Sequence, residues 1–195
     1  MSSPAKMTLS RYRAVLGDSI LTQALWVIGF AVATALGARA EITHLPVPYT
    51  LQTLVVLLAG ALLGPVNGAL SQIVYLGAGI SGVPVFAGGS VGLLVLAGPT
   101  GGYLMAFPVA AAVVGLLLER RRGIAREAAA MASGLFLIFA LGTVQLYAFA
   151  LHNFAAAVNA GFLIFSWWDL IKLCAAVMIY HEIAKRWGRI PAEQS

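Results

Sequence analysis

Residues 51–79 read LQTLVVLLAGALLGPVNGALSQIVYLGAG, an apolar stretch without a charged side chain. A membrane-spanning helix needs roughly 20 apolar residues, so the stretch is long enough to cross a bilayer. Gly64 and Pro65 interrupt it near its centre, and proline breaks or kinks a helix because it lacks an N–H and clashes with the preceding turn. We therefore expect two short helices in a membrane protein, at residues 51–63 and 68–79.

The composition of the whole chain points to the same class. Of its 195 residues, 61% are hydrophobic and 10% are charged, and the mean hydropathy is +0.91. A soluble domain is closer to about a quarter charged, so most of this surface cannot face water. Four more apolar segments fit spanning helices, at residues 20–40, 103–118, 128–151 and 162–184. The sequence thus predicts an all-α integral membrane protein, a six-helix transmembrane bundle formed by a single domain over residues 1–195.

The basic residues predict the orientation of this bundle. With six spans, ten of the 12 Lys and Arg residues fall on one side of the membrane. Basic residues accumulate on the cytoplasmic side, so both termini are predicted inside (N-in/C-in), with residues 1–19 and 186–195 cytoplasmic. Arg39 and Lys172 are the exceptions, and orientation does not explain Lys172. A cleaved signal peptide ending at residues 38–40 is a disfavoured alternative, since its removal would leave an odd number of spans.

One acid and one base stand inside the sixth apolar segment. Asp169 and Lys172 are three residues apart, so they project from one face of a helix. A charge at mid-membrane costs at least ~2.5–3.5 kcal/mol, and such residues usually face a bundle interior or a cavity. Counted from Phe162 at about 1.5 Å per residue, they lie roughly 10 and 15 Å from the outer end. The pattern predicts a polar ligand site open to the outside; a self-neutralising structural pair is the alternative.

The longest irregular stretch is SGVPVFAGGSVGLLVLAGPTGGY, residues 81–103, called the Gly-rich segment below. It carries no charge, and irregular backbone at membrane depth is tolerated only where it is buried in protein or lines a cavity. Gly88, Gly89 and Gly92 would let the main chain approach a ligand closely, because they have no side-chain bulk. A packed connector without ligand contacts is the alternative.

The same segment contains a G-x-S-x-G pattern around Ser90. A nucleophile elbow needs a strand before the serine and a helix after it, and neither is expected here. An intramembrane serine hydrolase would need His44 or His152 as its base. A hydrolase is therefore a disfavoured alternative.

Small residues recur every four positions in the first apolar segment. Ala31 and Ala35 form part of this stripe, which lets helices approach closely in lipid. The stripe serves either internal packing or docking of another membrane protein. Gln52 begins the next helix, where a lone polar residue is more often a cap than a ligand contact.

Several classes of site are excluded or disfavoured. The single cysteine, Cys174, allows no internal disulfide and gives no metal-ligand spacing. No G-x-x-x-x-G-K-[ST] motif occurs, so the chain does not bind ATP through a P-loop. The net charge of +5 is explained by topology rather than by nucleic-acid binding. We predict no cofactor and no metal.

The chain resembles the BioY family, the biotin-specific substrate-binding S components of energy-coupling-factor (ECF) transporters. The resemblance rests on LPVPYTLQTLVVLLAGALLG (residues 45–64), SGVPVFAGG (81–89), GPTGGYLMAF (98–107) and the Asp169-x-x-Lys172 pair. It implies a six-helix bundle that holds one biotin near the outer face of a bacterial inner membrane. It also implies a protein that binds and transports rather than catalyses.

The resemblance assigns roles to individual residues. Lys172 would pair with the biotin carboxylate, and Asp169 would accept from the ureido ring or orient the site. Ser90, after Gly89, lies where the family's loop supplies a polar contact, often from a longer Asn. Gln52 and Tyr103 fall in matching motifs as pocket liners.

The resemblance also implies a partner. Ala31 and Ala35 match the face by which S components meet an ECF module, which consists of a membrane coupling protein and two ATPases. A self-sufficient facilitator, or a proton-coupled transporter with Asp169 as the proton site, is the alternative.

Overall fold

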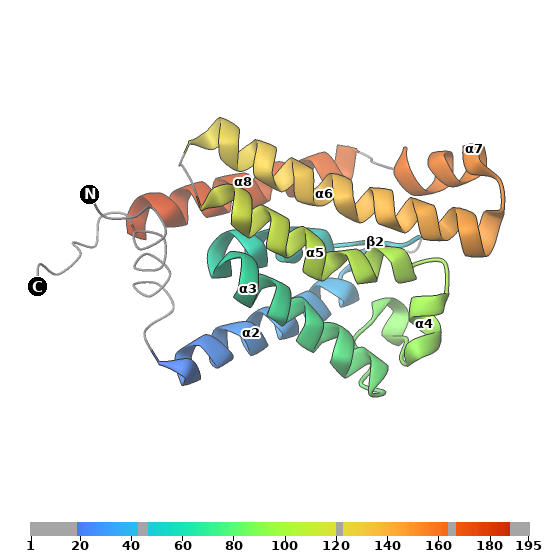
Figure 1. Cartoon of the computed structure of the whole chain (residues 1–195), viewed down its shortest axis with the longest axis horizontal. Helices are drawn as coiled ribbons and strands as arrows, with labels where there is room; N and C mark the ends of the chain where they lie inside the picture. The colour runs from blue at the N-terminus through green and yellow to red at the C-terminus, as the bar shows by residue number, and fades with distance from the viewer. Residues whose placement is uncertain (1–18, 43–46, 120–122, 164–166, 188–195) are drawn as a thin grey trace, which may run out of the picture.

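The computed structural model describes residues 19–42, 47–119, 123–163 and 167–187, and these are mostly helical (Figure 1). Within them, four helical runs are long and apolar enough to cross a membrane, which supports the predicted class. These runs are α2 (Ile20–Arg39), α3 (Gln52–Ile80), α5 (Gly101–Leu118), and α6 (Ile124–Leu146) continued by η2 (Tyr147–Leu151). A fifth long helix, α8 (Trp167–Trp187), carries the predicted charge pair.

Helix α3 is a hairpin of two arms. Gly64 has φ 80° and ψ −178°, a conformation that glycine adopts without strain. The second arm runs back along the first, because Gln52 donates to the Tyr75 hydroxyl at 2.6 Å and Gly68 packs against Gly60. Pro65 opens the second arm, where its missing N–H costs nothing. The predicted break is confirmed, but the predicted gap before residue 68 is wrong because Pro65 restarts the helix at once.

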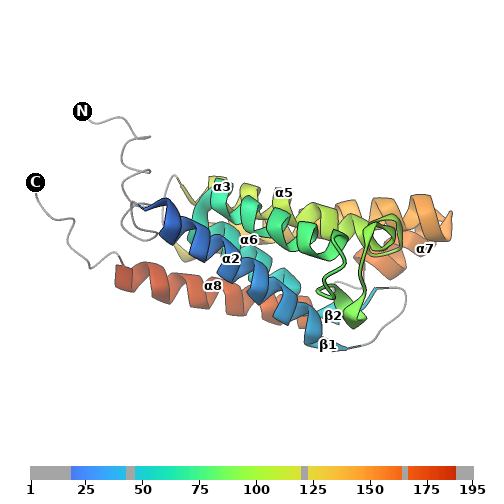
Figure 2. The same cartoon turned by 90° about the horizontal axis from the view of Figure 1, so that it is seen from below.

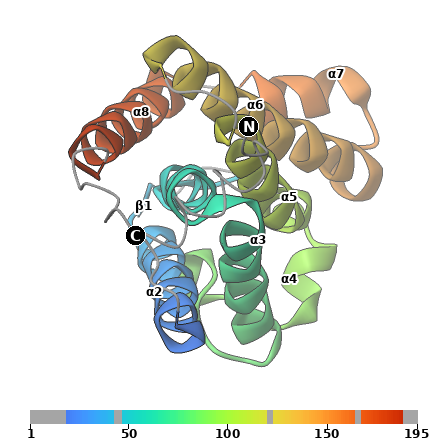
Figure 3. The same cartoon turned by 60° about the vertical axis from the view of Figure 1, so that its left-hand side comes forward.

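The two arms of α3 form the centre of the bundle. Figure 3 shows α3 between α2 and α5; α5 packs in turn on α6, and α8 lies against α6 and α3. Small residues allow this close approach, since a side chain at Gly60 would collide with the main chain of Ala111. The largest fully buried side chains include Leu57, Tyr75, Phe86, Met131, Leu135, Ile138 and Leu146.

The helix ends separate into two groups. The start of α2, the end of α5, the start of α6 and the end of α8 lie at one end of the molecule, on the left in Figures 1 and 2. A short ribbon of β1 (Glu41–Ile42) and β2 (Tyr49–Thr50) lies toward the other end, with α4 (Leu93–Ala97) and α7 (Phe154–Ala157). The ribbon is antiparallel, with Glu41 opposite Thr50.

The predicted sixth segment, residues 162–184, starts too early. Phe162 ends η3 (Val158–Phe162), and this turn follows α7, whose first turn is capped by Asn153. Asp169 therefore lies in the first turn of α8, about 3 Å along the helix at 1.5 Å per residue, and Lys172 about 7.5 Å along it. The error arises because residues 154–163 are as apolar as a span.

Candidate functional site

A cavity of about 310 Å³ lies where the β-ribbon, the Gly-rich segment and four of the long helices meet. Pockets for small molecules start near ~300 Å³. Much of its wall is apolar and aromatic, contributed by Val47, Phe86, Val95, Leu104, Phe107 and Phe139. Such a lining suits a small, largely apolar molecule with a few polar groups.

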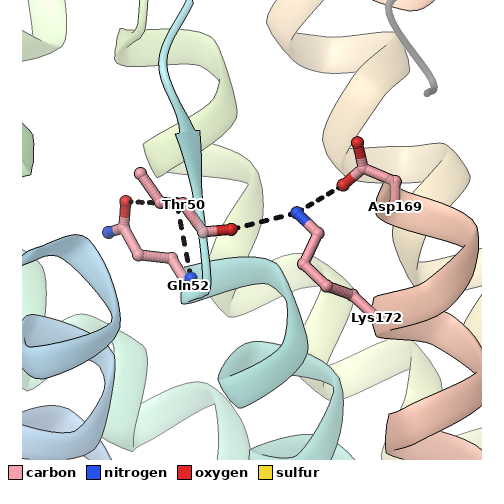
Figure 4. A network of polar contacts seen from close by, with 4 residues as sticks. All are labelled: Thr50, Gln52, Asp169 and Lys172. Carbon is pink, nitrogen blue, oxygen red and sulfur yellow. Dashed lines mark hydrogen bonds and ion pairs between the residues drawn. The ribbon is translucent and has the colours of Figure 1, made fainter. Parts of the chain in front are cut away.

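The charge pair borders this cavity and is buried. The Lys172 ammonium lies 2.5 Å from the Asp169 carboxylate, and the two residues are 4% and 2% exposed. Lys172 also donates to the main-chain carbonyl of Thr50 at 3.0 Å (Figure 4). Among the described residues, these contacts use two of the three ammonium hydrogens, and the third remains available to a ligand. The predicted common face of Asp169 and Lys172 is confirmed.

A network of hydrogen bonds around Gln52 forms another polar part of the cavity wall. The Thr50 hydroxyl donates to the Gln52 side-chain oxygen at 3.1 Å and accepts from the Gln52 N–H at 3.3 Å (Figure 4). The Gln52 amide donates to Tyr75, whose hydroxyl donates to the carbonyl of Val85 in the Gly-rich segment at 3.3 Å. Gln52 lines the cavity, and both the oxygen and the nitrogen of its side-chain amide are hydrogen-bonded.

Tyr103 and Ser90 also line the cavity. The Tyr103 hydroxyl donates to the Gly161 carbonyl at 2.9 Å, and its ring stands edge-on to Phe139. The hydroxyl thus ties the cavity wall to η3, while the ring faces the cavity.

Gly88, rather than Gly89, contributes the glycine wall of the cavity. Both adopt positive φ, 64° and 73°, in the turn η1 (Ala87–Gly89). This left-handed pair turns Gly89 toward the guanidinium of Arg39 instead. Ser90 follows this 3-10 turn and not a strand, so the described backbone lacks a nucleophile elbow; His44 lies outside the described residues.

Several lining residues have no signal in the sequence. The Thr50 carbonyl is a main-chain acceptor, which any residue supplies. Phe86 and Phe107 are two of nine phenylalanines in an apolar chain. Glu41 is different, because it is one of only seven acidic residues in the chain, and a rare charged side chain is a signal that the sequence does carry.

The two predicted docking residues of the small-residue stripe are buried to different degrees. Ala31 is 6% exposed and belongs to the buried core, and Ala35 is half-buried against it. This burial supports internal packing for Ala31, which was one of the two alternatives. Docking through Ala35 stays a prediction.

These features define a class: a multi-pass helical membrane protein with a mainly apolar cavity that contains one buried ion pair. The sequence model of the BioY family matches residues 6–189, so the chain belongs to the BioY family. The resemblance predicted from the motifs is therefore confirmed.

Curated relatives carry names that agree with this assignment. The "Biotin transporter BioY" of Thermotoga maritima is 41% identical over 156 residues, which are 80% of this chain and 92% of the relative. The "Probable biotin transporter BioY" of Pyrococcus horikoshii is 41% identical over 154 residues, 79% of this chain and 91% of the relative. These relatives are named transporters, in agreement with the prediction of a protein that is not an enzyme.

A solved structure shares the fold. The chain superimposes on a crystal structure titled as the S-component for biotin from an ECF-type ABC transporter with a TM-score of 0.78. The likeness covers 85% of this chain and 92% of the other, at 24% identity. It supports the arrangement of helices described above.

Proposed function

We propose that this protein binds biotin in the cavity beside Asp169 and Lys172 and serves as the substrate-specific component of biotin uptake. Membership of the BioY family and the names of its relatives support the ligand. The observation that carries the proposal is the buried Asp169–Lys172 pair at the edge of an otherwise apolar cavity. Buried charges of this kind usually mark a substrate site in membrane proteins.

The pair suits the ureido ring of biotin. A cyclic urea presents one carbonyl acceptor between two N–H donors, and the pair presents an ammonium donor beside a carboxylate acceptor. The resemblance assigned Lys172 to the biotin carboxylate. However, Asp169 lies 2.5 Å from that ammonium, and a second carboxylate would be repelled by it. We therefore assign the ureido ring to the pair and direct the carboxylate away from it.

The apolar wall suits the rest of the ligand. The fused thioether ring and the methylene chain of biotin can pack against Phe86, Phe107 and Phe139. Burying each methylene contributes about 0.8 kcal/mol. Ser90 and Gln52 supply further polar contacts on two sides of the cavity.

We propose six spans with both termini in the cytoplasm of a bacterium and the protein in its inner membrane. The two arms of α3 count as two spans, and α8 is the sixth, although its charges set it apart from the four most apolar runs. The start of α2 and the end of α8 lie at one end of the bundle (Figure 2). The basic residues Arg126, Lys185 and Arg186 flank helix ends in that group, which supports a cytoplasmic location.

We propose an ECF module, a membrane coupling protein with two ATPases, as the partner. The fold shared with an S-component supports this partner, and the sequence contains no P-loop of its own. Uptake of labelled biotin in cells that lack every coupling ATPase tests the point. Loss of uptake there supports the module, whereas full uptake favours a self-sufficient facilitator.

Mass spectrometry of small molecules that co-purify with the detergent-solubilised protein tests the ligand itself. Biotin at close to one molecule per chain is the expected result. Titration calorimetry of the emptied protein with biotin should then show saturable binding.

A further inference from the structure

The Gly-rich segment closes one side of the cavity but has little regular structure to hold it there. Between Ile80 and Gly101 it contains only the turn η1 and the short helix α4. Ala87, Gly88 and Ser90 line the cavity from this segment. Turns within the segment satisfy several of its main-chain groups, such as the Gly89 N–H, which donates to the Phe86 carbonyl at 3.0 Å.

One part of the segment is anchored by packing. Phe86 is 1% exposed and stands edge-on to Tyr75, with ring centroids 5.6 Å apart. A side chain at Gly79 would collide with the Phe86 ring, so the two fit closely. The residues just after Phe86 have no buried side chain of this kind, since Gly88 and Ser90 are exposed. The segment is bonded to α3 again at Gly92, whose N–H donates to the Gly79 carbonyl at 2.8 Å.

Two charged side chains, one at the end of α2 and one in the β-ribbon, bind the main chain of the segment on either side of Phe86. The Glu41 carboxylate accepts from the Gly88 N–H at 2.9 Å. The Arg39 guanidinium donates to the Pro84 carbonyl at 2.5 Å and lies against Gly89. Both are charge-assisted hydrogen bonds to main chain, which are stronger than neutral ones.

The same ribbon is tied to the charge pair. Glu41 pairs across the ribbon with Thr50, and the Thr50 carbonyl accepts from Lys172. A ligand that binds Lys172 therefore contacts a residue that is bonded to β2. The neighbouring strand, β1, carries Glu41, which binds Gly88. The contacts link α8, the β-ribbon and the Gly-rich segment in one connected path.

We propose that Arg39 and Glu41 form a clamp that keeps the Gly-rich segment closed over the occupied cavity and slows release of the ligand. Arg39 acts as a positioning residue through Pro84, and Glu41 acts through Gly88 while its residue also lines the cavity. This inference rests on the proposed function, because the ligand in its test is biotin. The clamp has a second readout that needs no ligand.

The first test measures dissociation of labelled biotin from the purified protein after addition of excess unlabelled biotin. Glu41→Ala and Arg39→Ala should each raise the dissociation rate by about tenfold, the equivalent of one lost charge-assisted hydrogen bond, with little change in the association rate. Glu41→Gln keeps an acceptor oxygen and should restore most of the slow release. Glu182→Ala is the matched control, because this carboxylate is on α8, is exposed, and lies 4.0 Å from Lys185.

The second test measures hydrogen–deuterium exchange in the ligand-free protein over residues 84–92. Exchange should be faster in Glu41→Ala than in wild type and Glu41→Gln, with unchanged exchange over α5 as evidence of a folded bundle. Unchanged exchange over residues 84–92 in Glu41→Ala, or a dissociation rate within twofold of wild type in both alanine variants, would overturn the clamp. Failure of wild type to bind biotin would instead defeat the proposed function, and exchange alone would then decide the clamp.

Discussion

The side-chain amide of Gln52 donates to the hydroxyl of Tyr75 at 2.6 Å, and this bond joins the two arms of α3 beside the cavity that Gln52 lines. Both residues are almost completely buried, at 4% and 1% exposure. The bond fixes one polar side chain of the site to the hairpin that forms the centre of the bundle. The site therefore lies at the open end of the hairpin, away from the turn at Gly64.

Tyr75→Phe should lower the free energy of unfolding by about 1–3 kcal/mol, because it leaves the buried Gln52 amide without its acceptor. Biotin affinity should fall as well, since Gln52 lines the cavity. Thermal unfolding in detergent and calorimetry measure the two effects. Tyr147→Phe is the control, because Tyr147 is 42% exposed. Equal stability of the two variants would show that the bond does not hold the hairpin.

A second polar contact, far from the site, has one buried partner, Glu127, and one partly exposed partner, His181. The His181 imidazole on α8 lies 2.8 Å from the carboxylate of Glu127 on α6, which is 2% exposed. His181→Ala should lower the free energy of unfolding by roughly 1–3 kcal/mol, because it leaves a buried acceptor without a partner. Adding Glu127→Gln should recover part of the loss, since a neutral amide costs less to bury than a charge.

The exposed pair Glu182 and Lys185, 4.0 Å apart, is the control for this contact. Lys185→Ala should change stability by less than about 1 kcal/mol, as expected of a surface ion pair. Biotin binding should stay near wild type in His181→Ala, because nine residues of helix, about 13 Å, separate it from Lys172. A large loss of binding without a loss of stability would assign His181 to the ligand site instead.

The docking prediction now depends on Ala35. Ala35→Trp should reduce biotin uptake in cells while leaving binding by the purified protein intact, because the larger side chain would block a closely packed partner helix. Ala31→Trp should instead lower the yield of folded protein, since Ala31 is in the core. Val32→Trp, at a position 53% exposed, is the control. Normal uptake by Ala35→Trp would remove this face from the partner interface.

The features that could be predicted from the sequence are those that interrupt its apolar runs. Gly64 and Pro65 interrupt an apolar run, and Asp169 and Lys172 place charge within another, so each departure had to have a structural cause. The predicted start of the last helix was wrong, because the residues before α8 are apolar and their sequence does not distinguish a connecting turn from a membrane span.

The remaining contacts of the site could not be predicted because they involve main-chain groups. The Thr50 carbonyl binds Lys172, and the Gly88 N–H binds Glu41. Every residue except proline carries both a carbonyl and an N–H, so residue identity does not indicate which of them will be used. Only the folded chain brings residues 50 and 172, or 41 and 88, together.

Calorimetric titration of wild type and Lys172→Ala with biotin and with biotin amide tests the role of the charge pair most directly. We predict that Lys172→Ala binds both ligands at least ~30-fold more weakly, about 2 kcal/mol or more, because the ureido ring is common to both and Asp169 is left buried without its cation. Hydrogen–deuterium exchange over α5 at the wild-type rate would verify that the variant is folded. If Lys172→Ala weakened the binding of biotin but not of biotin amide, Lys172 would instead bind the biotin carboxylate. Wild-type affinity for biotin in folded Lys172→Ala would contradict the assignment of the site.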